Sequence, residues 1–209
     1  MISAKFITSG CAVIQPEHSM TRRAVGKHWA TRQEESWLYD VRMTSAKDLQ
    51  ALYDYGYWAN GKLLAVVSQL TPEQFTQSVT GCYGSVRNTL VHILSTEWGW
   101  LDRCGGAQRG PALVATDYST VTSIIDRWRQ VETHVREFLA NLNDDDLDRV
   151  IEFSIGNGPR HAMRLGELMH HGAIHGIHHR GQVALLLRSL GQVPGNFDIL
   201  FYYGRNQPN

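Results

Sequence analysis

The stretch that decides the fold runs from Gly166 to Gly191 and reads GELMHHGAIHGIHHRGQVALLLRSLG. Six of the ten histidines of the chain lie between His161 and His179. Apolar and small residues recur in this stretch at intervals of three and four, which predicts one long helix over about residues 164–190. Gly191 follows the last leucine and a proline comes soon after it, so the helix is expected to end there.

The most informative pair in this stretch is His175 and His179. They lie four residues apart, so on a helix they occupy one face in adjacent turns. This spacing allows two imidazoles to bind one metal ion. The pair shares a stripe with leucines and should face inward, where imidazoles without a common partner would be poorly satisfied. The alternative to a metal site is a structural one, in which the histidines are hydrogen-bonded core residues or form a surface patch. From the pair alone, the metal site and the structural alternative both stay open.

Length and composition narrow the class of protein. The 209 residues suit one domain, or one domain with an extension, and 43% apolar residues are enough for a core. The formal net charge of +0 gives no sign of a nucleic-acid or acidic-membrane partner, and no apolar run approaches the length of a membrane span. Three cysteines without close pairing favour a reducing, cytoplasmic setting.

The first part of the chain differs from the rest. Residues 1–42 mix polar, small and breaker residues without sustained periodicity, which predicts an N-terminal extension that is flexible or loosely packed. Thr8–Cys11 faintly resembles a lipoprotein cleavage site, but the preceding apolar run is too short for a signal peptide. We therefore expect the folded domain to comprise residues 43–209.

The remaining chain predicts three further helices. Amphipathic stripes cover residues 45–70, 85–104 and 118–141, and a serine precedes two of them as an N-cap. Residues 149–164 instead combine a β-prone run with a glycine-rich turn, which predicts a small hairpin or extended excursion before the last helix. The predicted fold class is all-α, an up-down-type four-helix bundle.

Several side chains outside the histidine-rich stretch are candidates for a site or an interface. His92 lies in a row of small polar residues beside the apolar stripe of its helix, an arrangement that leaves room for a cavity. Taken alone, His92 is read as a partly exposed, hydrogen-bonded histidine. Tyr57 or Asn60 could face such a cavity. The aromatic segment 197–203 must pack on the bundle or on a second subunit.

From about Ser45 to Tyr203 the chain resembles the DinB/YfiT-like family of metal-dependent four-helix proteins, and residues 1–42 fall outside the resemblance. The matching segments are Tyr57-Trp58-Ala59-Asn60, Leu90-Val-His92-Ile-Leu, Val150–Ile155 with the glycines after it, and His175-Gly-Ile-His178-His179-Arg180-Gly181-Gln182. The last of these is the most specific.

The resemblance implies a divalent metal ion held by His92, His175 and His179, which would supply the missing third ligand. Neutral imidazoles suit zinc, nickel or iron, and three protein ligands leave a position open for water or substrate. No catalytic side chain is assigned beyond a metal-bound water or thiol. The residues that could orient the ligands or water are Glu97, Gln182 and His171.

The resemblance also suggests functions. Characterised relatives include transferases that use low-molecular-weight thiols, a thiol-dependent isomerase, and products induced by DNA damage. We therefore expect a metal-dependent thiol S-transferase that acts on a small electrophile, with a low-molecular-weight thiol as co-substrate. The alternatives are a metal-dependent hydrolase and a non-catalytic metal-binding, stress- or damage-inducible protein. A homodimer is expected, because paired bundles are common in the family.

Overall fold

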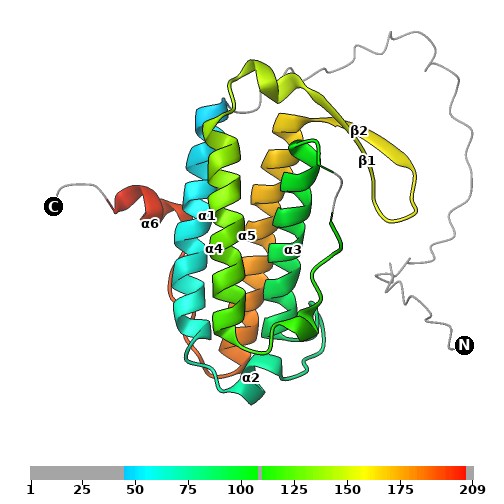
Figure 1. Cartoon of the computed structure of the whole chain (residues 1–209). Coiled ribbons are helices and arrows are strands. Elements are labelled where there is room, and N and C mark those ends of the chain that lie inside the picture. Colours follow the sequence, from blue (N-terminus) through cyan, green and yellow to red (C-terminus); the bar gives the residue numbers. More distant parts are fainter. Residues whose placement is uncertain (1–44, 108–109, 206–209) are drawn as a thin grey trace, which may run out of the picture. The chain divides into compact units, whose positions relative to one another are not determined.

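The computed structural model describes residues 45–107 and 110–205, so the predicted extension over residues 1–42 lies outside the described part. The described part is mostly helical with one small sheet, which confirms the predicted fold class (Figure 1). Its long helices are α1 (Ala46–Val67), α3 (Val86–Cys104), α4 (Val121–Ala140) and α5 (Leu165–Ser189). The shorter elements are α2 (Pro72–Thr76), η1 (Ala115–Asp117), η2 (Asp145–Asp148), β1 (Val150–Ser154), β2 (Arg160–Arg164) and α6 (Ile199–Gly204).

The long helices begin at polar caps. The Ser45 hydroxyl accepts a hydrogen bond from the Asp48 N–H, and the Asp48 carboxylate accepts one from the Ser45 N–H, so α1 starts with a capping box. Ser85 caps α3 as predicted. Thr120 caps α4 by accepting from the N–H of Ser123, and this cap explains why α4 begins slightly later than its sequence pattern suggested.

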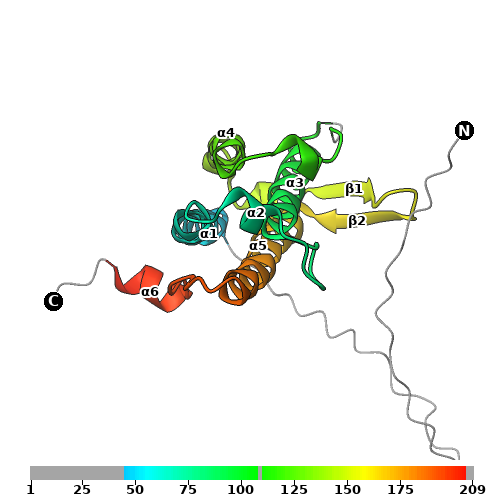
Figure 2. The ribbon, with the colours of Figure 1, turned by 90° about the horizontal axis from the view of Figure 1, so that it is seen from below.

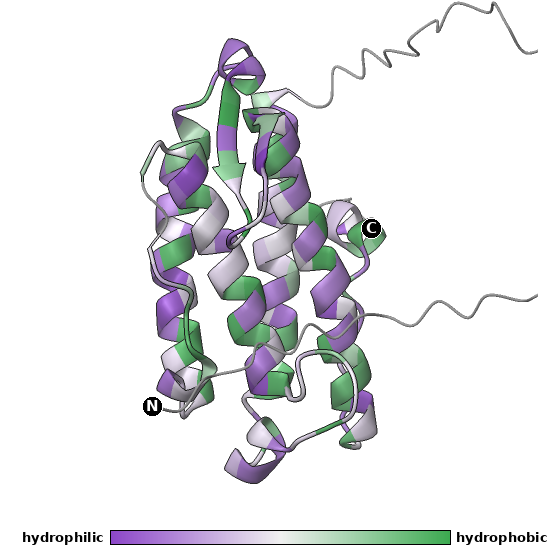
Figure 3. Cartoon of the chain, turned by 90° about the vertical axis from the view of Figure 1, so that its right-hand side faces the viewer, coloured by the Kyte–Doolittle hydropathy of each residue, from purple (hydrophilic) through white to green (hydrophobic). Residues whose placement is uncertain are grey.

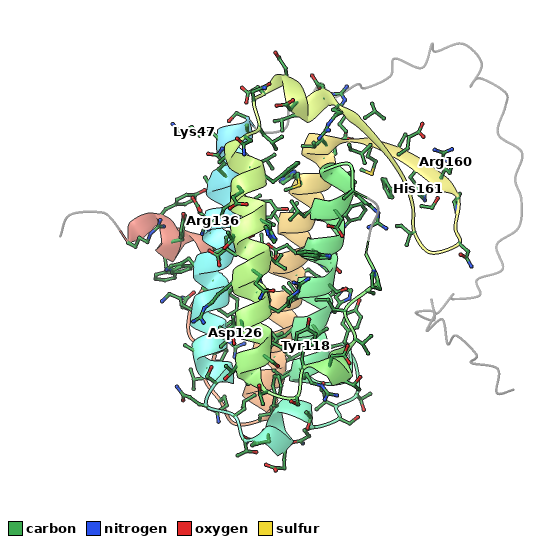
Figure 4. The ribbon with its side chains drawn as sticks, viewed as in Figure 1. Lys47, Tyr118, Asp126, Arg136, Arg160 and His161 are labelled. Atoms are coloured by element: carbon green, nitrogen blue, oxygen red, sulfur yellow. The ribbon has the colours of Figure 1, made fainter. Side chains whose placement is uncertain are left out.

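The four long helices lie side by side, as Figures 1 and 2 show from two directions. Helix α4 runs against α1, and Arg136 on α4 lies toward α1 (Figure 4), where it forms an ion pair with Asp54. Arg136 also pairs with Glu132, one turn away on α4 itself. The connection from α3 to α4 returns along α3, where the Leu113 N–H donates to the Ser95 hydroxyl at 3.0 Å. Helices α3 and α4 therefore run in the same direction, which refines the up-down-type pattern.

The apolar core fills the space between these helices. Each long helix contributes side chains with almost no exposure, and the hydropathy colouring in Figure 3 alternates along the helices as expected for amphipathic elements. Representative core residues are Leu49, Leu63, Leu90, Leu94, Ile124, Val131, Leu168 and Leu187. Burying a side chain of this size stabilises the fold by about 1.5–3 kcal/mol. Within the described ranges, no helix has both the length and the apolar character needed to cross a membrane.

The hairpin predicted before the last helix is present. Strands β1 and β2 pair antiparallel, and the positive φ of Gly156 at the turn between them is a conformation that glycine adopts without strain. Phe153 is buried and meets the ring of Trp100 edge-on at 5.1 Å between centroids. Strand β2 leads directly into α5, so the hairpin fixes where the histidine-rich helix starts.

The C-terminal aromatic segment forms α6, which Asp198 caps. One side of α6 packs on the bundle, because Tyr202 is buried and contacts the rings of Tyr55 and Trp58. The other side carries large exposed side chains, namely Leu200, Phe201 and Tyr203. The bundle therefore accounts for only part of the segment.

Candidate metal centre

The structure brings the three predicted ligands together. His92 from α3 meets His175 and His179 from α5, and one ring nitrogen of each lies within 4.8 Å of the other two. The Nε2 atoms of His92 and His175 are 3.0 Å apart. Two imidazole nitrogens bound to one tetrahedral zinc ion would be separated by roughly 3.3 Å, given Zn–N bonds of about 2.0–2.1 Å. The spacing of these side chains therefore fits a small divalent cation.

The helix geometry explains why these residues converge. His175 and His179 lie in adjacent turns of α5, and their ring centroids are 4.2 Å apart. Helix α3 runs against α5, so the middle of α3 passes the same turns and places the ring of His92 4.6 Å from that of His179. His178 is exposed and belongs to a different face of α5, so it does not join the group.

Gln182 fixes the orientation of one ligand. Its side-chain oxygen lies 2.7 Å from Nδ1 of His179. An amide oxygen can only accept, so His179 donates from Nδ1 and keeps its Nε2 lone pair for a metal ion. The amide nitrogen of Gln182 lies 3.1 Å from Nε2 of His178, which explains how this exposed histidine packs beside the group.

The electrostatic environment keeps the three imidazoles uncharged. Burial lowers the pKa of His92 to about 4, with a further contribution from His179. Burial and the neighbouring histidines lower the pKa of His175 to about 3, and burial also lowers the pKa of His179. All three rings are therefore neutral at pH 7, which is the form that binds metals.

The donor set is small and uniform. Among the residues that the structure describes, the group comprises three histidines and no fourth histidine, cysteine or carboxylate joins it. A cation held here would meet three neutral nitrogen donors and would still accept ligands from outside the chain. This donor set fits zinc, nickel or iron better than magnesium or calcium, which prefer oxygen ligands.

Tyr83 is a neighbour of the site that the sequence reasoning missed. Its ring stacks on His92 with 3.8 Å between centroids and meets His179 edge-on at 5.5 Å. Positive φ values at Gly81, Cys82 and Gly84 shape the loop that holds it there. A tyrosine between two glycines just before a helix cap was the available signal, but it did not reveal which ring Tyr83 would contact.

The other two predicted neighbours of the histidine group, His171 and Glu97, make their contacts with different partners. His171 is exposed, 5.8 Å from His175 between ring centroids and edge-on to Trp100 at 5.4 Å. Glu97 accepts a hydrogen bond from the hydroxyl of Tyr57 at 2.5 Å, so it is directed toward α1. That Glu97 or His171 orients metal ligands stays a prediction.

A second polar group lies behind the histidines, between α1, α3 and α5. We call it the interior polar cluster and define it as Tyr57, Asn60, Glu97 and Arg180. Arg180 is only 4% exposed, and its Nη1 donates to the Asn60 side-chain oxygen at 3.1 Å. The cluster lines a small cavity, in agreement with the expectation that Tyr57 or Asn60 could face one.

With this geometry in view, comparison with known proteins identifies the family. The family model described as "DinB family" matches residues 43–208, which is most of the chain. The chain belongs to the DinB family. A DinB-like protein from Bacillus cereus ATCC 10987 has the same fold, with a TM-score of 0.59 and 24% sequence identity, and the match covers 73% of this chain and 97% of that one.

Two curated relatives come from Bacillus subtilis strain 168. The first is named Protein DinB and is 22% identical over 158 residues, covering 72% of this chain and 91% of the relative. The second is the uncharacterized protein YizA, which is 23% identical over 146 residues, covering 70% of this chain and 90% of the relative. Their names state no reaction, so the family establishes the fold and is consistent with the histidine group, while the chemistry must be argued from the site.

Proposed function

We propose that this DinB-family protein is a divalent-metal-dependent enzyme that transfers a low-molecular-weight thiol to a small electrophile. The observation that supports this proposal is the group of three neutral imidazoles without a fourth ligand in the described part of the chain. When bound, the cation would supply a Lewis acid that lowers the pKa of a thiol ligand and favours the thiolate, the nucleophilic form.

The chain's own residues would set the charge and the shape of the site. The histidine group contains no carboxylate, so its three neutral rings would not neutralise the charge of a bound cation, and the site would favour an anionic ligand such as a thiolate. Gln182 holds the ring of His179, and Tyr83 covers one face of His92. These contacts limit the directions from which a second substrate can approach the histidines.

The test begins with elemental analysis of the purified protein, which decides among zinc, nickel and iron. The metal-loaded and metal-free forms are then assayed with a panel of low-molecular-weight thiols and small electrophiles. We expect thiol consumption that needs the metal and disappears in His175→Ala but persists in His178→Ala. Hydrolysis that is independent of thiol would instead support a metal-dependent hydrolase. Metal binding without turnover of any substrate in the panel would support a non-catalytic metal-binding protein.

A further inference from the structure

The small cavity behind the histidine group lies between α1, α3 and α5. Its walls include the interior polar cluster and three residues that directly follow the ligands in sequence, namely Ile93, Gly176 and Arg180. The cavity and the histidine group therefore lie back to back across the same turns of α3 and α5. It offers about 20 Å³ to the centre of a water molecule. One water needs roughly 10–15 Å³ by this measure, so the cavity has room for one.

Arg180 brings an unsatisfied donor to this cavity. One guanidinium nitrogen is bonded to Asn60, and the guanidinium lies over the ring of Tyr55 at 5.7 Å from the centroid. Its Nε–H is buried and has no hydrogen-bond partner among the residues that the structure describes. Leaving a buried donor unpaired costs about 1–3 kcal/mol, and more for a charged group. The guanidinium of Arg180 fits here because residue 176 is a glycine. A Cβ on Gly176 would lie 3.0 Å from Arg180 Nη1.

Glu97 brings an acceptor to the same cavity. Its carboxylate accepts a hydrogen bond from Tyr57 and interacts with the side chain of Trp128, and its two carboxylate oxygens still have further lone pairs available. Among the described contacts, no direct hydrogen bond or ion pair joins Glu97 to Arg180. Burial raises the pKa of Glu97, and the hydrogen bond from Tyr57 and the charge of Arg180 offset this only in part. A side chain with a free donor and a side chain with free acceptor capacity thus line the same water-sized cavity.

We propose that this cavity holds one ordered water molecule, which accepts a hydrogen bond from Arg180 Nε and donates one to the Glu97 carboxylate. The Tyr57 oxygen can provide a further acceptor, which would give the water the roughly three partners that buried waters usually have. The bridge would join α5 to α3 and, through Asn60, to α1. Because Arg180 follows His179 directly, it becomes a positioning residue for the metal ligands.

The water itself is tested by a crystal structure of the wild-type protein at high resolution, with and without a bromide soak. We expect one density peak within about 2.7–3.2 Å of both Arg180 Nε and a Glu97 oxygen, without an anomalous bromide signal. An empty cavity, or direct contact between Arg180 and Glu97, would overturn the proposal. A bromide signal in the cavity would show an anion site instead and would overturn it as well.

The positioning role is tested with Arg180→Met, which removes the donors and keeps a side chain of similar length. Arg188→Met is the matched control, because Arg188 is exposed on the same helix. Metal affinity is measured by chelator competition on protein shown to be folded by circular dichroism, beside the urea midpoint. We expect the dissociation constant to rise about tenfold in Arg180→Met, by analogy with residues that orient metal ligands, and to stay near the wild-type value in Arg188→Met.

A purely structural role would give a different result. Arg180→Met would then lower the urea midpoint, while the folded protein would bind metal as tightly as wild type, and the positioning role would be rejected. If Arg180→Met does not fold, Asn60→Ala provides the same measurement, because it removes the direct anchor of Arg180 and leaves the charge in place. These readouts do not depend on thiol transfer, so they can fail or succeed independently of the proposed enzyme activity.

Discussion

Two partly or fully buried polar groups lie back to back in this bundle. They differ in whether their side chains can satisfy one another's charge and hydrogen bonds. The histidine group gathers three side chains of one kind, and burial lowers the pKa of each ring, with a further contribution from neighbouring histidines. The interior polar cluster instead combines a cation, a carboxyl group and two neutral hydrogen-bonding groups, so its members largely satisfy one another.

The difference shows which group can bind a ligand from outside. Polar groups that are already hydrogen-bonded to one another gain little from an added ligand. Within the described residues, Arg180 Nε is an exception in this cluster, because it has no partner. Three neutral imidazoles that share only one close nitrogen contact are poorly compensated, and a cation would compensate all of them at once. The histidine group is therefore the one of the two that could hold a metal ion, whereas the interior polar cluster joins α1 to α3 and α5.

The largest effect is expected from removing a ligand. Changing His92, His175 or His179 to alanine leaves two protein donors, so metal affinity should fall by more than the 10–100-fold typical of an orienting neighbour. His178→Ala is the matched control from the same turn of α5 and should retain nearly full metal content. Metal stoichiometry after gel filtration, with circular dichroism to confirm folding, decides the matter. Loss of metal in His178→Ala together with retention in His92→Ala would reassign the ligands.

The lowered pKa values predict how acid affects the metal-free protein. His92 and His175 have folded-state pKa values of about 4 and about 3, below the unfolded value of about 6.5. Between these values the unfolded chain binds more protons, so the free energy of unfolding should fall as the pH drops from about 6.5 toward 3. Urea titrations across this range measure the effect.

Alanine in place of both His92 and His175 supplies the control, because it removes these two protonation sites from both states. In that variant the metal-free protein should lose less stability over the same pH range. An unchanged pH dependence would show that other groups dominate the acid response, and the contrast between the two polar groups would then lose its electrostatic basis.

A smaller effect is expected from filling the space between α1 and α5. A Cβ on Gly172 would lie 2.7 Å from the Tyr53 hydroxyl, which donates to the Met169 carbonyl at 3.0 Å. Gly172→Ala should therefore destabilise the fold by about 1–3 kcal/mol, the usual cost of overpacking. Gly181→Ala is the control on the same helix, where a Cβ meets nothing within 4 Å. There alanine should stabilise the helix by up to about 1 kcal/mol.

Urea denaturation of the two glycine variants gives both numbers. If Gly172→Ala were as stable as Gly181→Ala, the result would contradict the close approach of α1 and α5 at Gly172. It would also contradict the placement of the interior polar cluster, which lies between the same helices. The opposite signs expected for two identical substitutions make this a test of packing and not of helix propensity.

The sequence was most informative where periodicity carries the answer. The spacing of His175 and His179 predicts their common face, and the amphipathic stripes predict the four helices. The β-prone run with its glycine-rich turn predicts the hairpin. The third ligand was different, because the local pattern around His92 favours an ordinary polar histidine, and the family resemblance was needed to include it. The position of His92 beside His175 and His179 depends on how α3 packs against α5. The residue pattern of a single helix carries no information about that packing.

The features missed depend on long-range or loop geometry. Tyr83 reaches His92 because the loop before α3 turns through several positive φ values, and nothing in a helix or strand period encodes such a path. The same holds for Arg180, which donates to Asn60 and lines a cavity together with Glu97. Such pairings depend on the relative rotation of three helices.

The smallest effect concerns α6, one side of which packs against the bundle while the other side is exposed. Tyr202 is compensated by Tyr55 and Trp58, whereas Leu200 and Phe201 are 70% and 53% exposed. We propose that a second copy of the chain covers this outer side, so wild-type protein should sediment as a dimer at micromolar concentration. Leu200→Glu with Phe201→Glu should shift it toward the monomer while metal content stays unchanged, because both residues lie outside the histidine group. A wild-type protein that sediments only as a 23.6 kDa species would rule out the dimer and leave the apolar side of α6 unexplained.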